Sequence, residues 1–321
     1  MLSALLCKRR IMEEKKEYQE FCCQMKKAVQ ECFSKEVHIE IHKIVKNNSL
    51  ELDSLVILEE GRPMSPNFYL QSYYEEYRNG TSVKMLAKKM KKLYTEAVRR
   101  GECMEFDLSY ENCIKHIIFR LVSLEKNKML FQTVPYVPFM DMAVMFYLLI
   151  RKDEEGICSI RINHKLLKEW KIDIGDLFAL AKENTKRLFP ERICSMYSLM
   201  DAIEDSEEGN MLDGKLPQSS IKHIYPGEPF VITNDSGING AAVILYPDTL
   251  KNVAKILQGD FYLLPSSIHE VLAIPVHAGM KEQDLCDMVW EVNRTCVAKE
   301  EILSGSVYRY DQDTETLKIC H

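Results

Sequence analysis

The stretch Phe230–Val276, which reads FVITNDSGINGAAVILYPDTLKNVAKILQGDFYLLPSSIHEVLAIPV, decides the fold of the carboxyl-terminal part of this chain. It alternates short apolar, β-branched runs with Gly, Pro, Asn and Asp, a pattern typical of strands separated by turns. Pro247 and Gly259 bracket a segment whose apolar residues recur at helical spacing, which predicts one helix. The predicted strands are 230–233, 241–246, 261–264 and 270–276.

The residues that follow complete a predicted sheet unit. Apolar residues at helical spacing predict a helix over 282–293, and two short runs, 306–310 and 316–319, predict a closing hairpin. The elements therefore come in ββαββαββ order. Because strands joined by short turns pair antiparallel, we expect an antiparallel or mixed sheet in an α+β fold, and not a doubly wound fold.

The earlier part of the chain predicts helices mixed with β-hairpins. Strict alternation in VHIEIHKIV, residues 37–45, and a second run at 52–58 predict one hairpin, which turns at Asn47-Asn48-Ser49. Runs at 142–150 and 158–162 predict another. Helical spacing of apolar residues predicts helices over 13–33, 68–77, 81–100, 108–130, 164–170 and 173–188. This region is therefore also expected to be α+β.

Composition sets the expected domain boundaries. Residues 201–224 begin acidic and continue rich in Gly, Pro, Ser and Asn, which predicts a linker or variable loop. This segment separates an amino-terminal α+β region, 13–200, from a carboxyl-terminal α+β domain, 225–321. Residues 1–12 are expected to be disordered, and Met1 and Met12 are both possible starts.

Bulk properties indicate a soluble globular protein. The chain has 321 residues, of which 46% are apolar and 28% charged, and its net charge is -6. That charge disfavours non-specific binding to nucleic acid or to anionic membranes. No apolar run reaches the roughly 20 residues that span a bilayer, and the amino terminus is a poor signal peptide. The 11 cysteines include no CxxC pair, so we expect reduced thiols in the cytoplasm.

Polar residues at the ends of apolar elements form the candidate binding surface, because sites tend to lie on loops held by a rigid scaffold. Ser266, Ser267, His269 and Glu270 have the residue types of a hydrolase triad. In an extended chain, however, Ser267 and His269 share a face and Glu270 points away, so Glu270 cannot orient the imidazole toward Ser267. A carboxylate from elsewhere, such as Asp235 or Asp260, would be needed for catalysis. The candidate binding residues are Asn234, Ser266, Ser267, His269, Glu270, Asn293 and Arg294.

Two further clusters have weaker interpretations. One face of the helix predicted over 81–100 is basic, and such a face can bind phosphates or an acidic partner. His38, Glu40 and His42 share one face of a strand, but residues two apart along a strand are about 7 Å apart, too far for all three to share one ion easily. We therefore expect no metal site and, since no nucleotide-binding motif occurs, no cofactor. The residues of the basic face are Lys84, Lys88, Lys91, Lys92 and Arg99.

Four stretches carry a resemblance to a known family. They are LxILxxG with SPxxYLxxYYEEY at Leu55–Tyr77, AKENTxRLFP at Ala181–Pro190, ITN…GAAVILYP…LPSSIHEV at Ile232–Val271, and EVNRTxVAxEEILSxSVYRYD at Glu291–Asp311. The chain resembles an uncharacterised bacterial family, a domain of unknown function found in gut Gram-positive anaerobes. The resemblance covers nearly the whole chain from about Glu14 and implies a cytosolic bacterial protein. It implies no catalytic residue.

These observations favour a soluble cytoplasmic protein that acts by binding, as an interaction or regulatory module without catalysis. Its partner would be an unidentified protein or small molecule, with nucleic acid and membrane disfavoured. Two alternatives remain open. One is a hydrolase or transferase that uses Ser267 or Ser266 with His269. The other is a nucleic-acid-associated protein that binds through the basic helix face at 84–100.

Overall fold

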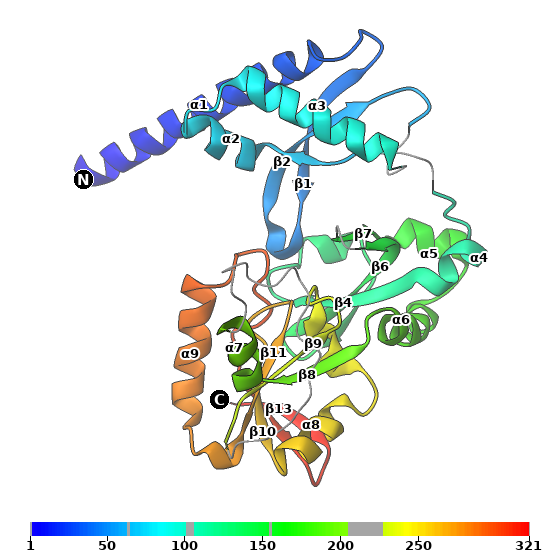
Figure 1. Cartoon of the computed structure of the whole chain (residues 1–321), viewed down its shortest axis with the longest axis vertical. Coiled ribbons are helices and arrows are strands. Elements are labelled where there is room, and N and C mark those ends of the chain that lie inside the picture. Colours follow the sequence, from blue (N-terminus) through cyan, green and yellow to red (C-terminus); the bar gives the residue numbers. More distant parts are fainter. Residues whose placement is uncertain (1, 63–64, 101–105, 154–155, 205–226, 321) are drawn as a thin grey trace. The chain divides into compact units, whose positions relative to one another are not determined.

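The computed structural model describes residues 2–62, 65–100, 106–153, 156–204 and 227–320, without the side chains of 2–11 and 201–204. The described chain forms two compact units (Figure 1). Unit 1 comprises residues 1–46 and 50–107, and unit 2 comprises residues 47–49 and 108–321. Helices and open antiparallel sheets are both present, so the α+β class predicted from the sequence is confirmed.

Unit 1 packs three helices against a small sheet. Its strands are β1 (His38–Val45), β2 (Glu51–Leu58) and β3 (Phe68–Tyr69), in the antiparallel order β1-β2-β3. Its helices are α1 (Leu2–Gln30), α2 (Leu70–Arg78) and α3 (Val83–Arg99). The Ser82 side chain caps α3 by accepting a hydrogen bond from the Met85 amide. Apolar stripes from all three helices meet alternate residues of β1 and β2 in one core that includes Phe21, Met25, Ile39, Leu55, Leu86 and Met90.

The first sheet of unit 2 has four strands. They are β4 (Ile117–Ser123), β5 (Tyr136–Phe139), β6 (Met142–Asp153) and β7 (Gly156–Arg161). Strand β4 pairs with one edge of β6, and β5 and β7 pair with the other edge, one after the other along β6. Helix α6 (Ile174–Leu188) covers one face, where the Phe178 ring lies edge-on to Phe119 and Phe146. The other regular elements of this part are α4 (Tyr110–Cys113), η2 (Ile114–His116), η3 (Leu130–Gln132) and α5 (His164–Trp170).

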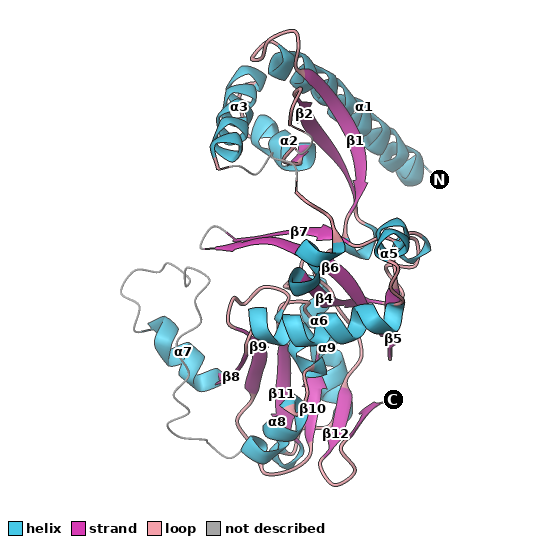
Figure 2. Ribbon diagram, turned by 90° about the vertical axis from the view of Figure 1, so that its right-hand side faces the viewer, coloured by secondary structure: helices cyan, strands magenta, loops and turns pink. Residues whose placement is uncertain are grey.

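The second sheet of unit 2 has six strands in the order β13-β12-β10-β11-β9-β8 (Figure 2). These strands are β8 (Glu191–Ser195), β9 (Phe230–Asn234), β10 (Phe261–Leu264), β11 (Val271–Pro275), β12 (Tyr308–Asp311) and β13 (Thr316–Ile319). Helix α9 (Glu282–Thr295) packs Leu285 and Val289 on the face that carries Tyr262 and Leu264. The remaining elements are α7 (Met196–Glu204), η4 (Gly240–Leu245), α8 (Thr249–Leu257), η5 (Val276–Ala278) and η1 (Asn47–Ser49).

The predicted helix over 108–130 is wrong, because Ile117–Ser123, in the middle of this range, is strand β4. Seven residues of this strand pair antiparallel with β6, from Ile117 opposite Leu148 to Ser123 opposite Met142. Arg120 alone among them is not fully buried. An apolar run that is buried on both faces fits helical and strand spacing equally well, so periodicity could not separate the two.

The predicted strand over 241–246 is also wrong, because Gly240–Leu245 is the 3₁₀ helix η4. The residue before it, Asn239, has the left-handed backbone conformation, with φ 54°. All residues from Gly240 to Ile244 are buried, again the condition in which periodicity carries no signal. The ββαββαββ order therefore fails at its second element, whereas the other predicted strands and helices of this region are present.

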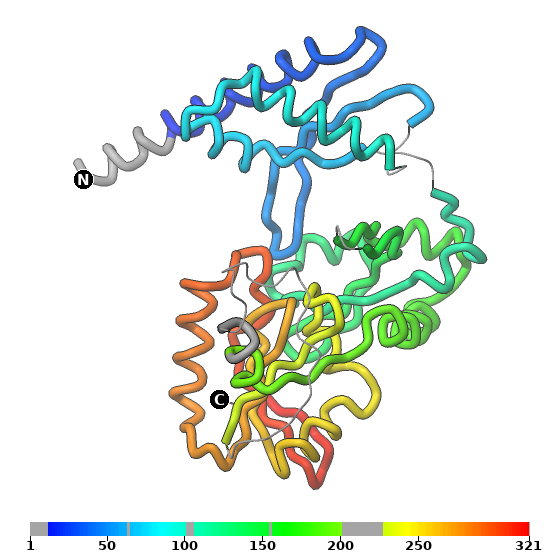
Figure 3. Tube along the Cα trace, in the orientation of Figure 1, coloured from blue at the N-terminus to red at the C-terminus, as the bar shows by residue number. Residues whose placement is uncertain are grey.

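The structure divides the chain at residue 107 and not within 201–224. Strand β8 precedes that segment and β9 follows it, yet the two pair over five residues and lie side by side (Figure 3). The predicted linker itself lies almost entirely outside the described residues. At the amino terminus, α1 extends to Leu2, into the segment 1–12 that was expected to be disordered. Within the described ranges, no helix has the length and apolar character needed to cross a membrane.

Candidate functional site

The candidate site lies where β9 ends and the chain turns back. The buried Asn234 side chain fixes this turn: its Oδ1 accepts hydrogen bonds from the Ser236 amide (3.0 Å) and hydroxyl (2.8 Å), and its Nδ2 donates to Ile238 O (2.9 Å). An Asn that bonds its own backbone two residues on is a common turn former. Asn234 therefore holds the loop in place, and Ile238 and Asn239 follow in fixed positions.

Gly240 allows this loop to touch the turn between β10 and β11. The Thr233 hydroxyl donates to His269 O at 2.8 Å across the contact. A Cβ atom on residue 240 would lie 2.5 Å from His269 O and 2.7 Å from Asn234 N, and closer still to Thr233 Oγ1. Since real Cβ atoms essentially never approach other atoms within 3.0 Å, only glycine fits at this position.

His269 is held at both ring nitrogens. Its Nδ1 accepts a hydrogen bond from the Asn239 amide at 3.2 Å, and its Nε2 lies 3.3 Å from Glu301 Oε1. An Nδ1 that accepts from an amide leaves the proton of the neutral imidazole on Nε2, where it faces Glu301. The imidazole is thereby oriented by a backbone group and an exposed carboxylate.

The serine residues have other partners. Ser267 is 4% exposed, and its Oγ accepts a hydrogen bond from the backbone amide of His269 at 3.0 Å. Ser266 O and Pro265 O accept from the amides of Leu303 and Ser304. Among the described residues, no hydrogen bond joins either serine hydroxyl to the imidazole of His269. The turn has the geometry of a hydroxyl-stabilised bend and lacks the serine–histidine contact of a nucleophile and its base.

The remaining predicted site residues are only partly brought together. Glu270 lies beside His269, where partial burial of its carboxyl raises the pKa, while His269 and a hydrogen bond with Ser267 oppose that rise. Asn293 lies on α9 and donates to Ser304 O at 2.8 Å, so it joins the segment that bonds the 265–267 turn. Arg294, also on α9, stacks on the Trp290 ring, 4.9 Å from its centroid, and Trp290 is 63% exposed.

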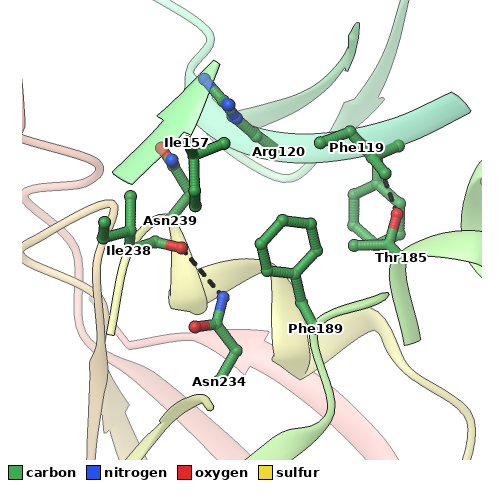
Figure 4. Close-up of a pocket in the computed structure, with 9 residues that line it drawn as sticks. Phe119, Arg120, Ile157, Thr185, Phe189, Asn234, Ile238 and Asn239 are labelled. Carbon is green, nitrogen blue, oxygen red and sulfur yellow. Dashed lines mark hydrogen bonds between the residues drawn. The ribbon is translucent and has the colours of Figure 1, made fainter. Parts of the chain in front are cut away.

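A small pocket adjoins this turn, and most of its residues were not predicted. Figure 4 shows Arg120, Ile157 and Asn239 on one side of it and Phe189 and Asn234 on the other. Its cavity measures about 10 Å³, enough for one water-sized group. Asn239 connects the pocket to His269, because its side chain lines the pocket and its amide donates to the imidazole. The lining residues are Ile118, Phe119, Arg120, Ile157, Thr185, Phe189, Asn234, Ile238 and Asn239.

One signal in the sequence marked this pocket. Arg120 is the lone charge in the apolar run IIFRLVS, and a charge inside a buried strand needs a reason. The incorrect helix over 108–130 concealed it, since Arg120 then fell on a solvated helix face. Asn239 gave a weaker signal, because its left-handed backbone could not be predicted from the preceding Ser-Gly-Ile.

The basic helix face is part of unit 1. Lys84, Lys88, Lys91, Lys92 and Arg99 are all exposed on α3. A shallow groove of about 410 Å³ lies along this face, lined by Lys88, Lys91, Lys92, Thr95, Glu96 and Arg99. Two of the cations have partners: Lys91 donates to Cys32 O, and Lys92 lies 3.9 Å from Glu96.

The histidine-rich strand face carries one ion pair. His42 Nε2 lies 2.9 Å from Glu40 Oε2 on β1. Across the part of the chain that the structure describes, no three His, Cys, Asp or Glu side chains are grouped to hold a metal ion.

Comparison with known proteins identifies the chain by family and not by activity. A family model described as a family of unknown function, DUF5688, matches residues 18–312. No curated protein and no solved structure shows significant similarity to the chain.

Proposed function

We propose that this chain, which belongs to the DUF5688 family, is a binding module without catalysis. Its ligand occupies the pocket beside the turn at 265–270 and contacts the loop that carries Asn239. This proposal rests on the contacts of the His269 ring, whose two nitrogens both have partners. An imidazole bonded to Asn239 and Glu301 has no free nitrogen to activate a serine. The same bonds make the ring a rigid support for the Asn239 loop.

A glycine substitution at Asn239 tests the binding proposal. Asn239→Gly removes the side chain that lines the pocket, while glycine tolerates the φ of 54° and keeps the amide that donates to His269. We expect a screen of small polar metabolites to yield ligands that raise the thermal midpoint of the wild type and leave Asn239→Gly unchanged. A ligand that shifts both proteins equally does not use this pocket, and a screen without any hit would count against the proposal.

The hydrolase alternative has its own test. A fluorophosphonate probe labels serines whose hydroxyl is activated by a base. Because Ser267 Oγ bonds a backbone amide instead of the imidazole, we expect no labelling of Ser266 or Ser267. Labelling that disappears in Ser267→Ala would establish a nucleophile and refute the non-catalytic proposal.

Charge on α3 supports a second candidate, an acidic partner such as nucleic acid. Lys84, Lys88 and Arg99 are exposed and make no ion pair within the described ranges, so their charge is available to a partner. Since each phosphate contact contributes a slope of about −0.9 in a plot of log K against log salt, three contacts predict a slope near −3. The triple variant Lys84→Gln, Lys88→Gln, Arg99→Gln should abolish a salt-dependent gel shift. Lys165→Gln, Lys168→Gln, Lys171→Gln in unit 2 is the charge-matched control and should retain it.

A bacterial cytoplasm is the proposed location. No disulfide joins the cysteine side chains that the structure describes, from Cys22 to Cys320, as expected in a reducing compartment. The motif resemblance to proteins of gut Gram-positive anaerobes supports a bacterial source.

A further inference from the structure

Arg120 is a partly buried cation for which the described protein provides no counter-charge. It projects from β4 on the face where Ser159 and Tyr147 also lie, opposite the face that α6 covers. Its Nη2 donates to Ser159 Oγ at 2.7 Å, and its guanidinium stacks on the Tyr147 ring at 4.2 Å. No carboxylate lies within ion-pair distance of it in the described chain. A guanidinium has five N–H donors, so its bonds to Ser159 and to the Tyr147 hydroxyl still leave donors unused.

The surroundings of Arg120 disfavour its charged form. Burial lowers the pKa of Arg120, and the nearby Arg161 guanidinium lowers it further by like-charge repulsion. Arginine nevertheless remains protonated in proteins. A buried charge is normally paired, because removing its water without a compensating partner is unfavourable.

The pocket defines what could provide the missing charge. Arg120 and Asn239 lie on one side of it (Figure 4), so a charged and an amide donor can address the same group. The remaining walls are largely apolar: Ile118, Phe119, Ile157, Phe189 and Ile238. A cavity of about 10 Å³ admits one water-sized group, such as a single oxygen of an anionic ligand. A carboxylate meets these conditions, because it is planar and matches the fork of a guanidinium.

We propose that the pocket recognises a carboxylate group, with Arg120 as the residue that binds it and Asn239 as the second donor. This inference deepens the proposed binding function, since it assigns the chemical class of the ligand at the same pocket. The 10 Å³ cavity takes one carboxylate oxygen, and the rest of the ligand extends from the pocket.

The test compares acetate and phosphate titrations of the full chain, with the thermal midpoint as readout. Arg120→Met removes the charge and keeps apolar volume, whereas Arg120→Lys keeps the charge and loses the fork. Arg309→Met removes one charge outside the pocket and controls for general salt effects. We expect acetate to stabilise the wild type and Arg309→Met saturably, with affinity weakened by about 10- to 100-fold in Arg120→Met and by less in Arg120→Lys.

The stability without acetate gives a second readout. A cation that lacks its counter-charge destabilises the empty protein, so Arg120→Met should unfold at the same temperature as the wild type or higher. If Arg120→Met fails to fold, or unfolds at a clearly lower temperature, Arg120 is a structural residue and the inference is overturned. Equal acetate responses in wild type and Arg120→Met would also overturn it, and a stronger response to phosphate than to acetate would refute the carboxylate assignment.

Failure of this inference is distinguishable from failure of the proposed function. A neutral metabolite that stabilises the wild type but not Asn239→Gly, together with no response to acetate, would leave the pocket as the binding site and remove only the carboxylate. The absence of both responses would reject both proposals.

Discussion

Alanine at Gly240 should destabilise unit 2 more than its single methyl group suggests. The added Cβ would lie 2.5 Å from His269 O and 2.7 Å from Asn234 N, both backbone atoms that cannot rotate away. It would also displace the Thr233 hydroxyl from His269 O. Overpacking costs about 1–3 kcal/mol and the lost hydrogen bond about 1 kcal/mol, so we expect a decrease of about 2–4 kcal/mol in the free energy of unfolding.

Urea unfolding followed by circular dichroism measures this decrease, with Gly305→Ala as the matched control. Gly305 belongs to the same unit, and a Cβ there meets no atom within 4 Å. Its backbone is outside the left-handed region, so the control should change stability by less than about 0.5 kcal/mol or increase it slightly. Stability of Gly240→Ala within that same margin would refute the close contact and, with it, the fixed position of the Asn239 loop.

A double mutant identifies which neighbour matters. Thr233→Ala removes the side-chain atom nearest to the added Cβ, and by itself should cost about 1 kcal/mol through the lost hydrogen bond. Each single variant loses that hydrogen bond, but the double variant can lose it only once. The double variant should therefore lose at least about 1 kcal/mol less unfolding free energy than the sum of the two single losses. Strict additivity would show that the loop adjusts without contact between residues 233 and 240.

Two further predictions concern other parts of unit 2. Tyr308→Phe should cost about 1–2 kcal/mol, because the Tyr308 hydroxyl bonds Asp141, which also accepts from Ser304 and Ser306; Tyr136→Phe is the control, and equal urea midpoints for the two variants would contradict the role of the network. Burial, followed by the Glu282 carboxylate, raises the pKa of the Cys320 thiol from 9.0 to about 11. Because the thiolate is the reactive form, iodoacetamide labelling of Cys320 in the folded protein, followed by mass spectrometry, should reach half its maximal rate near pH 11, and near pH 9 in urea. The unfolded chain releases this proton first, so the contribution of Cys320 to stability falls as pH rises from 9 to 11; labelling with the same midpoint in both states would contradict it.

The predictions from sequence succeeded where each element had one solvated face. The alternation in residues 37–45 located β1, and the helical spacing of apolar residues over 81–100 located α3. Both signals depend on contrast between polar and apolar positions. Where both faces are buried, as in β4 and η4, that contrast vanishes and the element type depends on its neighbours.

Site prediction was limited for a related reason. The turn at 265–270 and Asn234 were located because polar residues there interrupt apolar runs, and the structure does join Ser267, His269 and the Asn239 loop. Arg120 comes from a strand that is distant in sequence, and only tertiary packing brings it to the pocket. Glu301 reaches His269 from a loop after α9 for the same reason. Residues that are far apart in the chain and meet only in the folded protein leave no local sequence pattern from which the site could be predicted.

The paired residues Asn239 and Gly240 link the incorrect strand prediction to the site itself. An extended chain from Ala241 onward would continue without the close approach to the turn that carries His269. The left-handed Asn239 bends the chain first, and Gly240 then allows the contact with Thr233 and His269. The bend places the Asn239 amide on the imidazole and its side chain in the pocket. The bend at Asn239 and Gly240, which made the strand prediction wrong, therefore also forms the proposed binding site. This is expected where function requires a local departure from regular structure.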